Sequence, residues 1–210
     1  MSFPIARRAI LVGASLLTAP SIVRAQGANG VALVIGNSKY QWEAQLPNVK
    51  RDVPDVAKTF EAMGLKTVLV QDAGKSAMQE AIDKFGSAAR GAAFAAFYFA
   101  GHGTQWNKEA FLVPVDADLS VPKTDALVST NLVRAASQTA QYKMWVYDNC
   151  RNNPADGWRQ LASERSAVSF QDRALGDTDP NSLTLYSTAP GRVALDGPPG
   201  QNSPFAAAFL

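Results

Sequence analysis

The chain has 210 residues, of which 47% are hydrophobic, 18% charged and 9% aromatic, and this composition predicts one globular domain with a hydrophobic core. A formal net charge of +2 and scattered basic residues argue against a nucleic-acid partner, and no uninterrupted run of about 20 apolar residues offers a membrane span in the mature protein. With one Cys and one His, the chain has no internal disulfide framework.

The N-terminal residues have the pattern of an export signal. Arg7 and Arg8 precede an apolar run, and residues 23–25 resemble a small-residue cleavage site. We therefore expect residues 1–25 to be a signal peptide, of the twin-arginine or the Sec type. Residues 26–210 would form the exported domain, periplasmic or secreted. A retained anchor or an N-terminal amphipathic helix is the alternative.

The rest of the chain alternates apolar strands with amphipathic helices. Continuous apolar runs predict strands buried on both faces, and apolar residues three and four positions apart predict helices. We expect strands at 31–36, 65–70, 92–100, 111–115, 143–147 and 183–187, and helices at 48–63, 76–90, 131–140 and 204–210. Gly64 ends the first helix. Pro114 restricts the short strand at 111–115 to an edge or a strand end. The alternation predicts an α/β fold with a mostly parallel sheet covered on both faces.

The only His and the only Cys each follow a predicted buried strand. His102 comes after the strand at 92–100, and Cys150 comes after the strand at 143–147. Because the carboxyl ends of parallel strands meet at one edge of a sheet, we expect both side chains at that edge. An imidazole can take the thiol proton, and the backbone N–H groups of Gly103 and Cys150 can bind the oxyanion of a tetrahedral intermediate. The pattern predicts acyl transfer by a Cys–His dyad.

Other interpretations of these residues are less consistent with the pattern. If each residue is considered alone, His102 is interpreted as a structural histidine and Cys150 as a small core residue. A metal site built from His102, Cys150 and Asp148 lacks a recognisable ligand spacing, so no metal site is predicted. A thiol redox protein would need a resolving Cys, which the chain does not have.

Two motifs resemble the caspase-like cysteine peptidases. They are Tyr-Phe-Ala-Gly-His-Gly at 98–103 and Tyr-Asp-Asn-Cys-Arg at 147–151, and together with the strand at 31–36 and the helix around Asp52 they carry the resemblance from about residue 30 to residue 210. The most similar members are bacterial metacaspases, also called orthocaspases. His102 lies 48 residues before Cys150, close to the caspase separation of about 50 residues.

The resemblance implies a fold and an activity. The fold is a three-layer α/β/α caspase-like sandwich with a mostly parallel central sheet. The activity is that of a cysteine endopeptidase acting on proteins or peptides, with His102 as general base and Cys150 as nucleophile. The competing function is a caspase-like binding or scaffold domain that has no turnover. Neither implies an oligomeric state.

The resemblance also implies the residue after which the substrate is cut, the P1 residue. Family members that cleave after Arg or Lys have one acidic residue two positions before the Cys and another after the next strand. Asp148 and Asp196 match these positions, so we expect an S1 pocket that accepts a basic side chain. The alternatives are a strand-end cap for Asp148 and a turn residue for Asp196. Arg192 would instead neutralise the pocket or bind an acidic P1 residue.

No cofactor is required for this chemistry, although some metacaspases depend on calcium. The aspartate pairs Asp116 with Asp118 and Asp177 with Asp179 are candidate ligands, but neither completes a recognisable calcium loop.

Two further features follow from the family pattern. The polar segment 152–180 lies where family members have a processed linker, and it contains three candidate self-cleavage sites, Arg159, Arg165 and Arg173. An exposed loop is the simpler interpretation. The sequence stops at Leu210 within a predicted helix, whereas caspase-like domains continue into a final strand. We therefore expect either a fragment or a domain that lacks its last strand.

Overall fold

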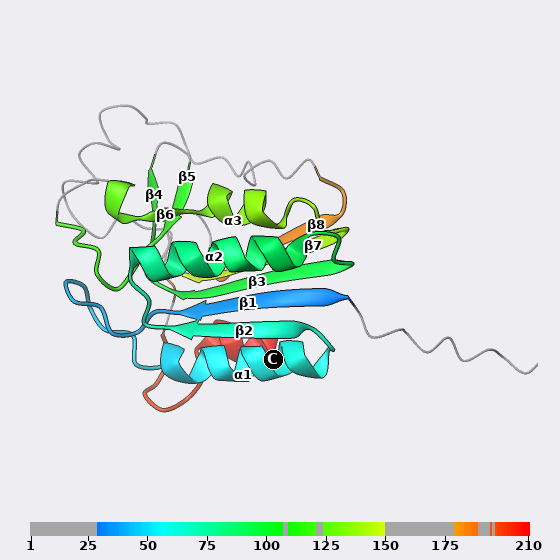
Figure 1. Cartoon of the computed structure of the whole chain (residues 1–210). Coiled ribbons are helices and arrows are strands. Elements are labelled where there is room, and N and C mark those ends of the chain that lie inside the picture. Colours follow the sequence, from blue (N-terminus) through cyan, green and yellow to red (C-terminus); the bar gives the residue numbers. More distant parts are fainter. Residues whose placement is uncertain (1–28, 107–108, 121–123, 150–178, 189–193, 195) are drawn as a thin grey trace, which may run out of the picture.

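The centre of the molecule is a parallel β-sheet. The computed structural model describes residues 29–106, 109–120, 124–149, 179–188, 194 and 196–210. Within these residues the central sheet has five strands in the order β2-β1-β3-β7-β8 (Figure 1). The strands are β1 (Gly30–Gly36), β2 (Lys66–Gln71), β3 (Phe94–Gly101), β7 (Tyr142–Asn149) and β8 (Ser182–Tyr186). Each described pairing in this sheet is parallel.

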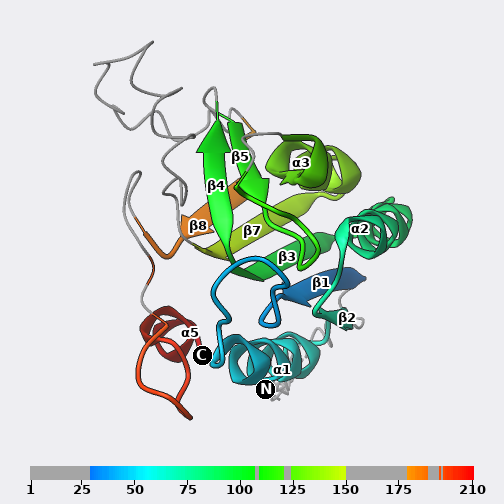
Figure 2. The ribbon, with the colours of Figure 1, turned by 90° about the vertical axis from the view of Figure 1, so that its left-hand side faces the viewer.

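Helices cover both faces of the sheet. Figures 1 and 2 show α1 (Val49–Ala62) and α5 (Pro204–Phe209) on one face, with α2 (Lys75–Ala89) and α3 (Thr130–Ser137) on the other. The sheet's continuous apolar strands bury side chains in two hydrophobic clusters, one beneath each helical layer. This arrangement confirms the predicted three-layer α/β/α sandwich with a mostly parallel sheet.

The strand β3 shows why the sheet is rigid. Its side chains alternate between the two layers, so Phe97 packs beneath α2 and α3 while Tyr98 packs beneath α1 and α5. Both side chains are fully buried. Truncating a fully buried aromatic side chain such as Phe97 to Ala costs about 3–5 kcal/mol, so the strands hold their ends in fixed positions.

A close approach sets the position of α1. A Cβ atom on Gly36 would lie 2.6 Å from both Cγ atoms of Val53, so glycine at the end of β1 lets α1 pack directly on the sheet. At its other end the helix finishes as expected, because Gly64 adopts the left-handed conformation with φ +85°. The first turn of α1 is therefore held beside the carboxyl edge of the sheet.

A small antiparallel sheet projects from that edge. In the described part it consists of β4 (Gly103–Trp106), β5 (Glu109–Leu112) and β6 (Val128–Ser129), with a 3₁₀ turn at Thr124–Ala126 before β6. Figure 2, which looks onto the carboxyl edge, shows β4 and β5 standing over the central sheet. The strand predicted at 111–115 corresponds to β5, which ends two residues before Pro114. Neither β4 nor β6 was predicted from the sequence.

Candidate active site

The ends of β3 and β7 bring His102 and Asp148, two of the predicted site residues, to one edge of the sheet. In the parallel pairing of these strands Ala100 lies opposite Asp148, and Gly101 lies opposite Asn149. His102 follows β3 directly, and Cys150 follows β7 directly in the sequence. Cys150 itself lies outside the described residues.

The ring of His102 is oriented by a backbone carbonyl. Its Nε2 lies 2.7 Å from the carbonyl oxygen of Ala44. Because a carbonyl oxygen only accepts hydrogen bonds, Nε2 is the donor in this contact, and Nδ1 is the basic nitrogen of the neutral ring. A base held by a third group in this way is the arrangement that activates a nucleophile. The Ala44 carbonyl was not predicted, because a main-chain acceptor has no signature in residue type.

Tyr40 contacts the same histidine through a hydrogen bond and through its ring. Its hydroxyl accepts a hydrogen bond from the backbone N–H of His102 at 2.7 Å and donates to the carbonyl of Val113 at 3.3 Å. The two rings are in contact, with centroids 4.5 Å apart. A Cβ atom on Gly101 would lie 2.5 Å from the Tyr40 hydroxyl, so the glycine before His102 makes room for this contact.

Three carboxylates gather beside this histidine, and we call Asp52, Asp148 and Asp196 the carboxylate cluster. Asp148 at the end of β7 is 7% exposed, and its Oδ2 accepts hydrogen bonds from the Tyr98 hydroxyl at 3.2 Å and the Ser203 hydroxyl at 3.0 Å. Among the described residues these partners are side-chain hydroxyls, which does not favour a strand-end cap for Asp148.

Asp52 of α1 was not singled out as a site residue. It is 0% exposed, and its Oδ1 accepts the Ser203 backbone N–H at 3.0 Å. Among the residues that the structure describes, its Oδ2 has no hydrogen-bond partner. Ser203 therefore joins two carboxylates, while its hydroxyl also accepts from Ala206 N as the N-cap of α5. The signal for Asp52 was in the sequence, because this acidic residue lies on the apolar stripe that Val49, Val53 and Val56 define.

Asp196 completes the cluster. It is half-buried, and its Oδ2 accepts a hydrogen bond from the backbone N–H of Asn48 at 3.4 Å. The charge of Asp196 adds to the effect of burial in raising the pKa values of Asp52 and Asp148. The nearby His102 acts to lower the pKa of Asp196. The structure thus brings Asp148 and Asp196, the two predicted pocket residues, to the same site as His102.

Burial makes the cluster hard to ionise completely. Burial raises the pKa of Asp52 from 3.8 to about 6, with the Ser203 N–H opposing the shift and the charge of Asp148 adding to it. Burial also raises the pKa values of Asp148 and Asp196. Among the described residues no Lys or Arg forms an ion pair with the cluster. Such a site favours a cationic ligand, which would balance the charge.

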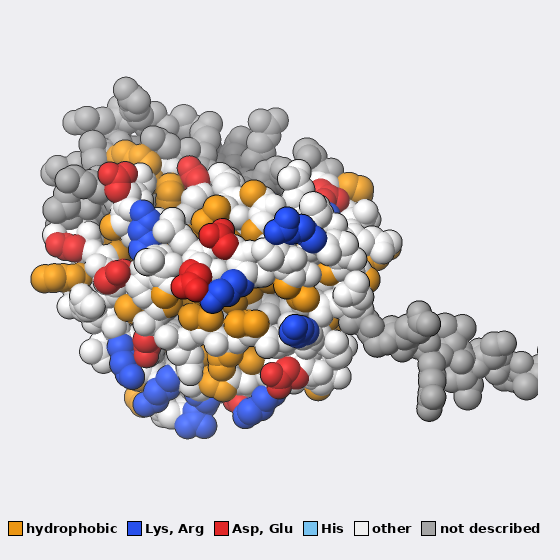
Figure 3. All heavy atoms as spheres, viewed as in Figure 1, with side chains coloured by type: hydrophobic (Ala, Val, Ile, Leu, Met, Phe, Trp, Pro, Cys, Tyr) orange, Lys and Arg blue, Asp and Glu red, His pale blue; other side chains and the backbone are white. Residues whose placement is uncertain are grey.

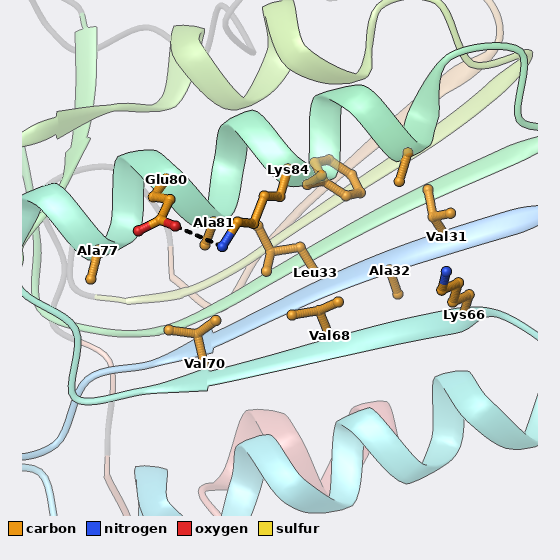
Figure 4. A pocket seen from close by; sticks show the side chains of 12 residues that line it. Val31, Ala32, Leu33, Lys66, Val68, Val70, Ala77, Glu80, Ala81 and Lys84 are labelled. Carbon is orange, nitrogen blue, oxygen red and sulfur yellow. Dashed lines mark ion pairs between the residues drawn. The ribbon is translucent and has the colours of Figure 1, made fainter.

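A concave surface lies away from this edge. Figure 4 shows a groove between α2 and the strands β1 and β2. Its volume is about 370 Å³. Its lining is mainly aliphatic, and its charged residues are Lys66, Glu80 and Lys84, of which the last two form an ion pair at 2.6 Å. Figure 3 shows this apolar band across the middle of the face. The groove contains neither His102 nor any member of the carboxylate cluster, so it is not part of the site.

The candidate calcium ligands that the structure describes have hydrogen-bond or ion-pair partners in the protein. Asp116 accepts a hydrogen bond from the Lys75 backbone N–H at 3.0 Å, and Asp118 accepts one from the Ser120 backbone N–H at 2.8 Å. Asp179 is paired with Lys143. In the described ranges no group of three or more His, Cys, Asp or Glu side chains is arranged to hold a metal ion.

A membrane-crossing helix is likewise not found among the residues that the structure describes.

Several predictions concern residues outside the described part of the chain. These are the signal peptide at 1–25, the nucleophile Cys150, the candidate calcium ligand Asp177, the candidate cleavage sites Arg159, Arg165 and Arg173, and Arg192.

Comparison with known proteins identifies the family. A family model described as the caspase domain matches residues 29–210, so the chain belongs to the caspase domain family of cysteine peptidases. The human mucosa-associated lymphoid tissue lymphoma translocation protein 1 is 27% identical over 122 residues, and so is its mouse homolog. Each match covers 58% of this chain and 15% of the relative, so the chain corresponds to a small part of those proteins.

Proposed function

We propose that this chain is a cysteine endopeptidase of the bacterial metacaspase type, with His102 as general base and Cys150 as nucleophile. The observation that carries the proposal is the hydrogen bond between His102 Nε2 and the Ala44 carbonyl. It makes Nδ1 the proton acceptor at the edge where β7, the strand directly before Cys150, ends. Membership of the caspase domain family supports the same chemistry.

In the proposed reaction Nδ1 of His102 takes the proton of the Cys150 thiol, and the thiolate attacks the carbonyl carbon of the scissile bond. Backbone N–H groups of Gly103 and Cys150 stabilise the oxyanion. The imidazolium then gives the proton to the leaving amine as the C–N bond breaks. Water, deprotonated by Nδ1, attacks the thioester, and the thiol regains its proton when the acid product leaves.

The carboxylate cluster supports cleavage after Arg or Lys. Asp148 and Asp196 line the S1 pocket in this proposal, and Asp52 adds a third carboxylate, one oxygen of which has no partner within the described part of the chain. A guanidinium carries five N–H donors in a planar fork that pairs well with carboxylates. An acidic P1 residue would be repelled by the same groups.

We also propose an exported enzyme. Residues 1–25 would act as the signal peptide, and residues 26–210 would work in the periplasm or outside the cell on protein or peptide substrates. The dyad needs no cofactor, and calcium is proposed only as an activator whose effect the assay below measures.

The direct test is hydrolysis of fluorogenic peptides that differ only in P1, which is Arg, Lys or Asp, with and without calcium. The full chain and a form beginning at Gln26 are assayed beside Cys150→Ala. We expect release after Arg and Lys that the substitution abolishes. Release only after Asp would contradict the pocket assignment while keeping the peptidase. No release by folded protein under any condition would favour the scaffold domain.

Alkylation of Cys150 tests the dyad without a substrate. A thiol activated by His102 should react with iodoacetamide at about pH 6.5 faster than a free thiol does, because its pKa is lowered from about 8.5. The control is His102→Gln, which should react at the slower rate. A wild-type rate equal to that of a free thiol would argue against the dyad.

A further inference from the structure

Asn48, the residue before α1, does not act as an ordinary helix cap. Asparagine at this position usually accepts a hydrogen bond from the first turn of its own helix. Here the side chain makes no such bond, although the residue is 2% exposed and immediately precedes Val49. Its polar atoms are instead directed to a segment about 150 residues later in the chain.

The partner of Asn48 is the turn at residues 196–200. Its Nδ2 donates to the carbonyls of Asp196 at 2.7 Å and Pro198 at 2.9 Å, with a longer contact of 3.3 Å to that of Gly197. Its Oδ1 accepts the backbone N–H of Gly200 at 3.1 Å. Both glycines have a left-handed backbone, with φ +82° and +83°, so the tight shape of this turn depends on them.

These contacts hold Asp196 from two sides. The Asn48 side chain binds the carbonyl of Asp196, and the Asn48 backbone N–H binds its carboxylate. The next turn of the same helix carries Asp52, and α1 is packed directly on β1 through Gly36. One rigid helix therefore sets the distance between the loop-borne carboxylate and the buried one.

We propose that Asn48 is a positioning residue for P1 specificity, which holds the 196–200 turn so that the Asp196 carboxylate faces the other two members of the carboxylate cluster. The inference rests on the proposed preference for a basic P1 residue. It predicts that Asn48 acts on substrate affinity through Asp196, and that it has little effect on the chemical step at His102.

The test compares Asn48→Ser with the wild type. Serine is an equally good helix cap, but it is too short to reach the turn, so helix capping and turn anchoring are separated. We expect KM for the Arg peptide to rise about tenfold, with kcat changed less than about twofold, because a displaced Asp196 would lose one hydrogen bond to the charged P1 guanidinium. Agmatine, a small guanidinium compound, should bind about tenfold more weakly in calorimetry. The matched control is Asn131→Ser at the start of α3, which should change neither value.

A double-mutant cycle with Asp196→Asn decides whether the effect passes through Asp196. If it does, Asn48→Ser combined with Asp196→Asn should be no worse than Asp196→Asn alone. Fully additive losses would overturn the positioning role. So would an unchanged KM in Asn48→Ser when the wild type cleaves after Arg, and in that case the proposed peptidase would stand. A wild type that neither cleaves after Arg or Lys nor binds agmatine would overturn the basic pocket and this inference together.

Discussion

The two sides of the carboxyl edge are built from different kinds of groups. On one side, His102 is held by neutral partners, a backbone carbonyl and the hydroxyl of Tyr40. On the other side, the carboxylate cluster concentrates negative charge and is held by neutral donors from Ser203 and Asn48. The first side suits proton transfer and the second suits recognition of charge. Substitutions on the first should therefore lower kcat, and substitutions on the second should raise KM.

The largest expected effect is on the histidine side. His102→Gln keeps a side chain of similar size but removes the base, so kcat for the Arg peptide should fall about 1,000-fold with little change in KM. Steady-state kinetics on protein with an unchanged circular dichroism spectrum measures this. If kcat stayed within a few-fold of the wild type, His102 would not be the base.

The next effect is on the charged side. Asp148→Asn keeps an acceptor for Tyr98 and Ser203 but removes the charge, so kcat/KM for the Arg peptide should fall about 100-fold, mainly through KM. A peptide with citrulline at P1, which is neutral and nearly isosteric with Arg, is the matched substrate. The wild type should discriminate strongly between the two peptides, and the variant should not. Equal discrimination by both proteins would remove Asp148 from the pocket.

Asp52 should reveal a conflict between stability and recognition. Its pKa in the folded protein is about 6, against the usual 3.8, so between these pH values the folded state binds more protons than the unfolded state. Its contribution to stability is therefore complete below about pH 4 and is lost as the pH rises through about 6. Asp52→Asn cannot ionise and still accepts the Ser203 N–H.

We therefore expect Asp52→Asn to raise the free energy of unfolding by about 3 kcal/mol at about pH 7.5, and to leave it unchanged at about pH 3.5. Urea titrations at both pH values measure the difference. Asp55→Asn, on the side of α1 where Asp55 pairs with Lys58, is the control and should change it by less than about 0.5 kcal/mol. A uniform gain at both pH values would mean that ionisation of Asp52 is not the cause.

The smallest effect returns to the histidine side. Tyr40→Phe leaves the backbone N–H of His102 without its partner, which should cost about 1 kcal/mol of stability. Looser positioning of the ring should lower kcat about fivefold and leave KM unchanged. A change in KM without a change in kcat would show that the two sides are less separate than their contacts indicate.

The fold was predictable because its signals are local. Continuous apolar runs identified the three inner strands of the central sheet, β1, β3 and β7. The edge strands β2 and β8 lie where strands were predicted, but they are more exposed than a strand buried on both faces. The spacing of apolar residues identified α1 and α2 to within a residue or two. The small sheet was harder, because β4 and β6 are two to four residues long and mix polar with apolar side chains. Periodicity carries no information over so short a span.

The candidate site was predictable only in part. The position of His102 after a buried strand indicated the edge, and the family resemblance identified Asp148 and Asp196. The groups that orient these residues were not predicted. The Ala44 carbonyl is main chain, and Ser203 and Asn48 make contacts about 150 residues distant in sequence, which no local pattern encodes. The role of Cys150 stays a prediction.

The Ser203 contacts also have a consequence for the order in which the protein is made. Ribosomes complete β3 and α1 long before they reach residues 196–203, which supply one member of the carboxylate cluster and the donors that join the other two. A nascent chain thus carries its histidine early but lacks an assembled cluster until residues 196–203 emerge and dock. If the pocket selects basic residues as proposed, neighbouring nascent chains would be spared cleavage during synthesis.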